Sequence, residues 1–171
     1  MGDSVTITVT ALAPEQQTYI QPFQISPTSG VLPFNIVWIG YLSNHPTLQS
    51  DDPAVNGETI ELQILQGGVW TTVATAITES VWIPDPSSPT GEREIYGRFD
   101  GVFTIPLSWG AGTYSFRAHY GGNPSKYLLG CEKESSVTGT DGENGNVLGT
   151  LLLIGALITG VISVGIVSWK R

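Results

Sequence analysis

An uncharged stretch of 21 residues, Val147–Val167, sets the strongest limit on what this 171-residue chain folds into. It also lacks proline, and as an α-helix it would be about 31 Å long at 1.5 Å per residue. Since the hydrocarbon core of a bilayer is about 30 Å thick, the stretch predicts a transmembrane helix, expected over residues 147–168. A buried helix of this length in a soluble protein would need a much larger surrounding domain.

The residues that flank this stretch predict how it is oriented. Trp169 is an expected interfacial anchor, and Lys170 and Arg171 complete a short basic tail, 169–171. Because cytoplasmic flanks carry an excess of Lys and Arg, we expect the C-terminus in the cytoplasm and the preceding domain outside. The first ten residues show no signal-peptide pattern. Prior removal of a signal peptide and helix-driven insertion, as in tail-anchored or virion membrane proteins, both stay open.

Small residues follow one stripe of the expected helix. They are spaced by four or lie beside that row: Gly155, Ala156, Thr159, Gly160 and Ser163. Small side chains at this spacing let two transmembrane helices approach closely. The stripe therefore predicts self-association, with a single helix that is merely rich in small residues as the alternative.

Residues 1–137 show the two-residue alternation of β-strands instead of a helical period. Ser4–Thr10 and Glu58–Ile64 alternate clearly, and Gly67-Gly68 separates the latter from the β-rich run Val69–Ile77, which predicts a hairpin. Further expected strands are Thr18–Ile25, Phe34–Tyr41, Gly101–Leu107, Thr113–Tyr120 and Tyr127–Val137. So many short strands predict an all-β sandwich.

The segment between the sandwich and the uncharged stretch has few apolar residues. Ser135–Asn146 consists mainly of Gly, Ser, Thr and acidic residues, and we expect residues 138–146 to form a flexible linker. Asp141–Asn146 also resembles a calcium loop, but it lacks the distal bidentate carboxylate that such a loop needs. The linker is therefore the preferred interpretation.

Three parts of the chain, Ser26–Phe34, Leu62–Thr75 and the two runs Asp100–Ile105 and Gly112–Asn123, resemble the immunoglobulin-like repeats of bacterial and archaeal surface proteins. Ser26–Phe34 is similar to the opening of the polycystic-kidney-disease-type repeats. Leu62–Thr75 resembles their two-strand hairpin, in which a Gly-rich turn precedes a Trp. Asp100–Ile105 and Gly112–Asn123 look like their last strands. The resemblance covers residues 26–137 and implies an immunoglobulin-like sandwich of about seven to nine strands.

Two local features qualify this resemblance. Residues 80–99 are an insertion where the family usually has a tight turn. Gly112, Tyr114 and Phe116 match the layout of a tyrosine corner, so the Tyr114 hydroxyl is expected to bond the backbone upstream. An ordinary strand tyrosine is the alternative.

The composition gives little support to catalysis or nucleic-acid binding. The net charge is -8 with only 7 Lys and Arg, whereas nucleic-acid backbones require basic surfaces. His45 and His119 are the only histidines, Cys131 is the only cysteine, and no pair has metal-ligand spacing. Nucleophile-elbow and phosphate-loop motifs are also missing from the sequence. We therefore expect no catalytic site, no metal and no cofactor.

Aromatic residues are the best candidates for a binding site. Trp82, Tyr96 and Phe99 lie in the insertion, and Trp109 precedes the expected tyrosine corner. Exposed aromatic rings on a rigid sandwich stack on sugars or anchor a protein partner. Long loops on rigid scaffolds often carry function. These four residues form the candidate binding loop, unless they cover the ends of the core.

Together these patterns predict a single-pass membrane-anchored surface module, microbial or viral, with a non-catalytic adhesive, spacer or assembly role. Its expected partners are the lipid bilayer, a second copy through the helix, and a protein or glycan ligand. Two alternatives stay open: a structural membrane protein of a virion, and a carbohydrate-binding module that uses the aromatic loop.

Overall fold

The structure is a computed structural model, and it describes residues 14–46 and 52–142. The expected strand at 4–10, the transmembrane helix at 147–168 with its stripe of small residues, and the basic tail lie outside these residues. Across 14–46 and 52–142, no helix is both long and apolar enough to cross a membrane.

Strands dominate the described residues, as the sequence predicts. In chain order the elements are β1 (Tyr19–Ser26), β2 (Ser29–Val31), β3 (Phe34–Ser43), η1 (Pro53–Val55), β4 (Thr59–Gln66), β5 (Val69–Ile77), β6 (Glu79–Pro84), β7 (Glu92–Ile105), η2 (Leu107–Trp109), β8 (Gly112–Tyr120), η3 (Pro124–Lys126) and β9 (Cys131–Thr140). The three η elements are single turns of 3-10 helix. The all-β class is thereby confirmed for this part of the chain.

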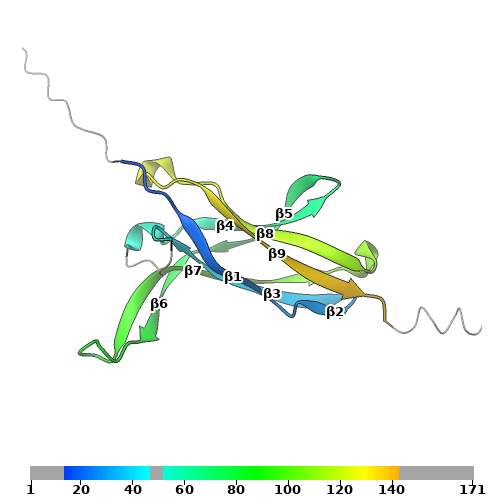
Figure 1. The fold of residues 1–171 in the computed structure, drawn as a ribbon, viewed down its shortest axis with the longest axis horizontal. Coiled ribbons are helices and arrows are strands. Elements are labelled where there is room, and N and C mark those ends of the chain that lie inside the picture. Colours follow the sequence, from blue (N-terminus) through cyan, green and yellow to red (C-terminus); the bar gives the residue numbers. More distant parts are fainter. Residues whose placement is uncertain (1–13, 47–51, 143–171) are drawn as a thin grey trace, which may run out of the picture.

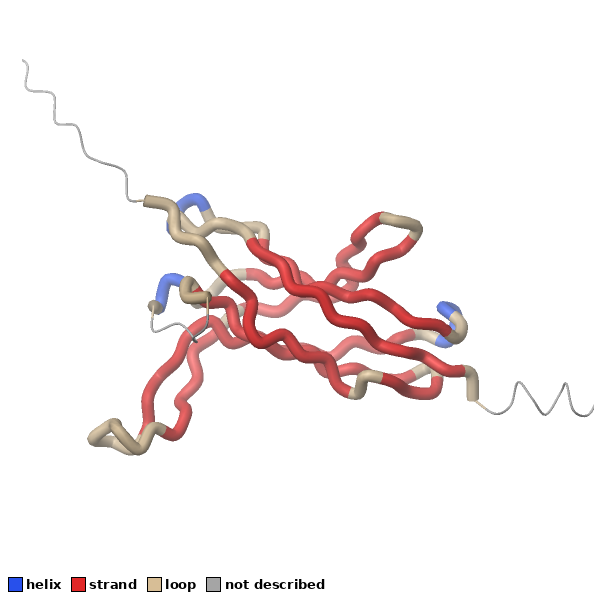
Figure 2. Tube along the Cα trace, in the orientation of Figure 1, coloured by secondary structure: helices blue, strands red, loops and turns tan. Residues whose placement is uncertain are grey.

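The strands form two sheets that face each other, a sandwich-like architecture (Figures 1 and 2). One sheet has the order β1-β3-β7-β6, and the other has the order β2-β9-β8-β4-β5. Neighbouring strands are antiparallel except for β2 and β9, which run parallel. The β4–β5 and β6–β7 hairpins project from the body in different directions (Figure 2).

The β4–β5 hairpin follows directly from the local sequence. Ile60, Leu62 and Ile64 are buried on one face of β4, as their two-residue spacing predicts. Gly67 and Gly68 have φ angles of 57° and 82°, a conformation that suits glycine in a two-residue hairpin turn. The predicted hairpin is thereby confirmed.

The core lies between the two sheets and is built by both. Trp38 and Phe99 come from the β1-β3-β7-β6 sheet, and their ring centroids are 5.7 Å apart. Phe116 and Leu62 come from the other sheet and belong to the same buried cluster. Trp38 is fully buried.

The predicted tyrosine corner is present where β8 begins. The Tyr114 hydroxyl donates a hydrogen bond to the backbone carbonyl of Gly110, four residues upstream. Trp109 covers this corner, with its ring centroid 5.4 Å from that of Tyr114 and 5.7 Å from that of Phe103. The corner therefore fixes the crossover from η2 into β8.

Two expected boundaries need correction. Residues 80–99, expected to be a loop-like insertion, instead belong to the β6–β7 hairpin. Glu94 pairs with Trp82 across the two strands, and the side chain of Ile95 is buried on the inner face of β7. The last strand also continues past residue 137 to Thr140, into the expected linker. It does so because β2 pairs with Thr138–Thr140 and because Gly139 packs against Leu32.

Candidate functional site

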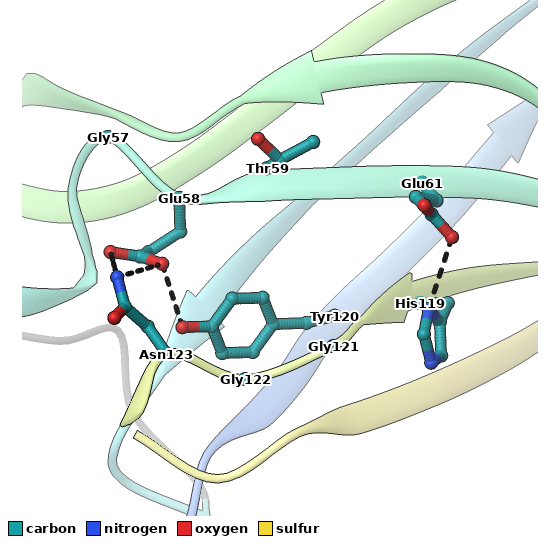
Figure 3. Close-up of a pocket in the computed structure, with 9 residues that line it drawn as sticks. All are labelled: Gly57, Glu58, Thr59, Glu61, His119, Tyr120, Gly121, Gly122 and Asn123. Carbon is teal, nitrogen blue, oxygen red and sulfur yellow. Dashed lines mark hydrogen bonds and ion pairs between the residues drawn. The ribbon is translucent and has the colours of Figure 1, made fainter. Parts of the chain in front are cut away.

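A pocket of about 370 Å³ opens where β4 begins and β8 ends (Figure 3). Gly57, Glu58, Thr59 and Glu61 line one side, and residues 119–123 line the other. The pocket has three acidic or basic side chains: Glu61 on β4 and His119 on β8, which pair across the two strands, and Glu58 directly before β4. The pocket is therefore polar, and its chemistry depends on how these groups are paired.

Glu58 is the most deeply buried of these groups, with 5 % of its surface exposed. Its Oε2 accepts a hydrogen bond of 2.8 Å from the Tyr120 hydroxyl, and Nδ2 of Asn123 lies 3.1 Å from both carboxylate oxygens. Lys126 Nζ lies 2.6 Å from Oε1. The buried carboxylate is thus compensated by one cation and two neutral donors, as a buried charge requires.

These contacts shift the pKa values of both Glu58 and Tyr120. Burial by itself would raise the pKa of the Glu58 carboxyl, but the hydrogen bonds from Lys126, Tyr120 and Asn123 outweigh burial and leave the pKa below its usual range. Burial raises the pKa of Tyr120 strongly, and the neighbouring Glu58 carboxylate raises it further. Glu58 is therefore ionised and Tyr120 is neutral at neutral pH.

The partners of Glu58 also tie two loops together. Lys126 Nζ donates to the backbone carbonyls of Ala54 and Asn56, at 3.0 and 2.8 Å. Asn123 Oδ1 accepts from the backbone N–H of Ser125 and so caps η3. The cluster consequently fastens the β8–β9 loop to the segment that precedes β4. Glu58 therefore helps to hold these two segments in place through its contacts with Tyr120, Asn123 and Lys126.

A second polar network runs along the outer face of the same sheet. His119 Nδ1 lies 3.3 Å from Glu61 Oε2, which also accepts 2.6 Å from Gln63 Nε2. Gln63 Oε1 in turn accepts 2.7 Å from Arg117 Nε, and the Arg117 guanidinium lies 4.5 Å from the centroid of the Trp70 ring. Alternation alone places these side chains outward, but only the register between β4, β5 and β8 brings them together.

Metal binding finds no support in the part of the chain that the structure describes. No group of three or more His, Cys, Asp or Glu side chains there is arranged to hold a metal ion. The Glu61–His119 pair offers two ligands only. Cys131 is a free, partly buried cysteine, and burial raises the pKa of its thiol. A raised pKa lowers the thiolate fraction and with it the reactivity of the sulfur.

The four aromatic residues expected in one binding loop occupy three different environments. Trp82 is 61 % exposed on β6, opposite Glu94. Tyr96 is half-buried on β7, and its hydroxyl donates 2.9 Å to Glu94 Oε2. Phe99 is buried in the core and Trp109 is half-buried at the tyrosine corner. The structure brings Trp82 and Tyr96 to one face, and the expectation for Phe99 is wrong because its side chain packs inward.

The described fold defines the class of protein: an all-β chain with two sheets in a sandwich-like arrangement. No protein-family model matches the sequence, and no curated protein matches it either. Any finer assignment therefore depends on the strand order and on the geometry of the sites described above.

Proposed function

We propose that this chain is an immunoglobulin-like sandwich carried as a surface module by a single-pass membrane anchor, with a non-catalytic adhesive, spacer or assembly role. The strand order supports the immunoglobulin-like part. The sheet β1-β3-β7-β6 corresponds to strands A, B, E and D of that fold, and β9, β8 and β4 correspond to G, F and C. The tyrosine corner at the start of β8 agrees with this assignment.

The observation that carries the anchored role is the position at which the sandwich ends. The last strand, β9, reaches Thr140, and the uncharged stretch Val147–Val167 follows only a few residues later. In this proposal that stretch spans the bilayer, the sandwich lies outside, and the C-terminal Lys170 and Arg171 face the cytoplasm. The stripe of small residues would join two copies within the membrane.

The contacts of the Glu58 carboxylate in the polar pocket support a non-catalytic role. A general acid or base needs a pKa near the working pH, and the pKa of Glu58 is moved the other way. The role that remains is recognition or spacing. An assembly role in a virion membrane is a variant of this proposal, and a gene neighbourhood without capsid genes would contradict it.

Membrane fractionation of the full-length chain tests the anchor. We expect the protein in the membrane pellet after alkaline carbonate extraction and its sandwich removed when intact cells are treated with protease. Leu157→Arg places a charge at the centre of the stretch, which costs about 2.5–3.5 kcal/mol in the bilayer. This variant should move to the soluble fraction.

Leu129→Arg is the control, because Leu129 lies in the sandwich and is partly exposed. It should stay in the membrane pellet like the parent protein. Full recovery of the parent protein in the soluble fraction without detergent would rule out the anchored role.

A glycan ligand is the second candidate, and the pair Trp82 and Tyr96 favours it. Hydrogen bonds from Ser80 and Tyr96 lower the pKa of the Glu94 carboxyl, so an ionised acceptor lies beside an exposed indole ring. Sugars are bound by such a combination of a stacking ring and a fixed acceptor. Binding on a glycan array that Trp82→Ala removes and Trp109→Ala retains would support this role. An array without binding would eliminate it.

A further inference from the structure

One end of the sandwich, which we call the stem end, gathers the β2–β3 turn, the β4–β5 turn, η2 and the end of β9. The strand register places them at the same end of the five-stranded sheet. Val31 pairs with Thr140, and Gly112 pairs with Gly139. Ile64 pairs with Phe116, so β4 runs from there toward the same end as β9. In Figure 1, β2 lies near the point where the chain leaves β9, and the β4–β5 hairpin projects from the same half of the molecule.

Apolar side chains stand exposed at the stem end. They are Val31, Leu65, Val69 and Leu107, with exposed fractions of 56, 41, 63 and 60 %. Single exposed apolar residues are ordinary on protein surfaces. Here four of them lie in or beside three separate turns at one end of the sandwich, and exposed apolar side chains concentrated at one place often mark interaction sites.

The stem end is also nearly uncharged, in contrast to the rest of an acidic chain. The segments 27–33, 62–78 and 106–112 contain no Asp, Glu, Lys or Arg. Asp141, just beyond β9, is the first charge that the chain adds there. The opposite end carries the Glu58–Lys126 pair. The two ends of the sandwich therefore differ in charge.

The chain leaves the sandwich at this end and has little length before the uncharged stretch. Gly142 lies next to Val31, since a Cβ on Gly142 would be 3.2 Å from the Val31 side chain. The five residue steps from Gly142 to Val147 span at most about 18 Å even when fully extended. A bilayer that holds Val147–Val167 therefore faces the stem end at close range.

We propose that the stem end lies on the lipid surface, with Val31, Leu65, Val69 and Leu107 in the interfacial region of the bilayer. The inference rests on the membrane anchor of the proposed function and adds the orientation of the sandwich. The uncharged surface explains why lipid is the occupant, because burying charges in this region would be costly. Zwitterionic lipid is sufficient, since the stem end offers no cations for anionic head groups.

Site-directed labelling of the full-length chain in phosphatidylcholine vesicles tests this orientation. In a Cys131→Ser background, Val69→Cys and Leu107→Cys carry an environment-sensitive fluorophore. Leu129→Cys is the matched control, because Leu129 is a partly exposed leucine of the β8–β9 loop at the opposite end. We expect blue-shifted emission at positions 69 and 107, and several-fold stronger quenching there than at 129 by a nitroxide placed near the lipid head groups.

Three other results would each overturn the inference in a distinguishable way. Failure of the labelled chain to float with the vesicles removes the anchor and the inference together. Flotation with equal quenching at 69, 107 and 129 removes the inference alone and leaves the anchor. A blue shift that grows with the protein-to-lipid ratio and resists the lipid quencher assigns the stem end to a second copy of the chain.

Discussion

Lys126 and Glu58 form an ion pair of 2.6 Å between Nζ and Oε1, and this pair joins the β8–β9 loop to the start of β4. The two side chains differ in their surroundings, since Glu58 is almost fully buried and Lys126 is more than one-third exposed. Loss of the ion pair should therefore cost more at Glu58, whose charge would be left buried without a cation, than at Lys126, whose charge is still in contact with water.

Glu58→Gln should reduce the free energy of unfolding by about 1.5–3 kcal/mol, the usual range for hydrogen bonds to a charged group. The neutral amide keeps the shape but loses the ion pair with Lys126 and the strong acceptor for Tyr120. Urea denaturation at neutral pH measures the change. Glu132→Gln is the control, because the exposed Glu132 pairs with Arg117 at the surface and should cost about 0–1 kcal/mol.

The same residue predicts how stability depends on pH. The pKa of Glu58 is lowered in the folded state, so it lies below the pKa of glutamate in unfolded chains. The stabilisation that Glu58 contributes is then fully present at pH values above its pKa in the unfolded chain. It is lost as the pH falls through its pKa in the folded protein. Glu58→Gln should reduce the acid-induced loss of stability below about pH 5. If the melting temperature of the variant falls with decreasing pH as steeply as that of the parent protein, the loss is due to other carboxylates.

Tyr114→Phe tests the tyrosine corner. The substitution removes only the hydroxyl that bonds the Gly110 carbonyl, and it should cost about 0.5–1.5 kcal/mol. Tyr41→Phe, at a half-buried tyrosine of the other sheet, is the matched control for loss of a hydroxyl group. Equal and negligible effects of the two substitutions would mean that the corner does not stabilise the fold.

The sequence predicts those parts of the fold that depend on local patterns. Alternation identifies the buried face of β4, and Gly67-Gly68 identifies the hairpin turn, because both signals lie within a few neighbouring residues. The tyrosine corner is equally local, since its donor and acceptor are four residues apart.

Contacts between distant strands are beyond the reach of such patterns. Phe99 was expected in a binding loop, yet its alternation with Ile95 directs it inward once β6 and β7 pair. The Glu58 cluster was missed because Lys126 and Asn123 lie on a different loop and carry no motif. The only sequence signal was a single acidic residue directly before an apolar-alternating strand.

Gly97 provides a test of such a non-local contact. It has a φ angle of 83°, and a Cβ there would lie 2.0 Å from the Leu42 backbone carbonyl. Glycine in the interior of a strand often marks this kind of close approach. Gly97→Ala should therefore destabilise the domain by about 2–4 kcal/mol through backbone strain and overpacking.

Gly112→Ala is the matched control, because a Cβ at Gly112 meets no atom within 4 Å. It should change the free energy of unfolding by about 0.5 kcal/mol at most. Comparable losses at both positions would show that the contact between β7 and Leu42 is not the cause.

Truncation should affect the stability of the domain very differently at the two aromatic residues of the β6–β7 hairpin that differ most in burial. Phe99→Ala removes a ring that packs on Trp38 in the core, and it should cost about 3–5 kcal/mol. Trp82→Ala removes an exposed ring and should leave the melting temperature nearly unchanged. Thermal denaturation of the two variants measures the contrast. A large loss for Trp82→Ala would mean that its ring supports the hairpin, and it would then be unavailable as a recognition surface.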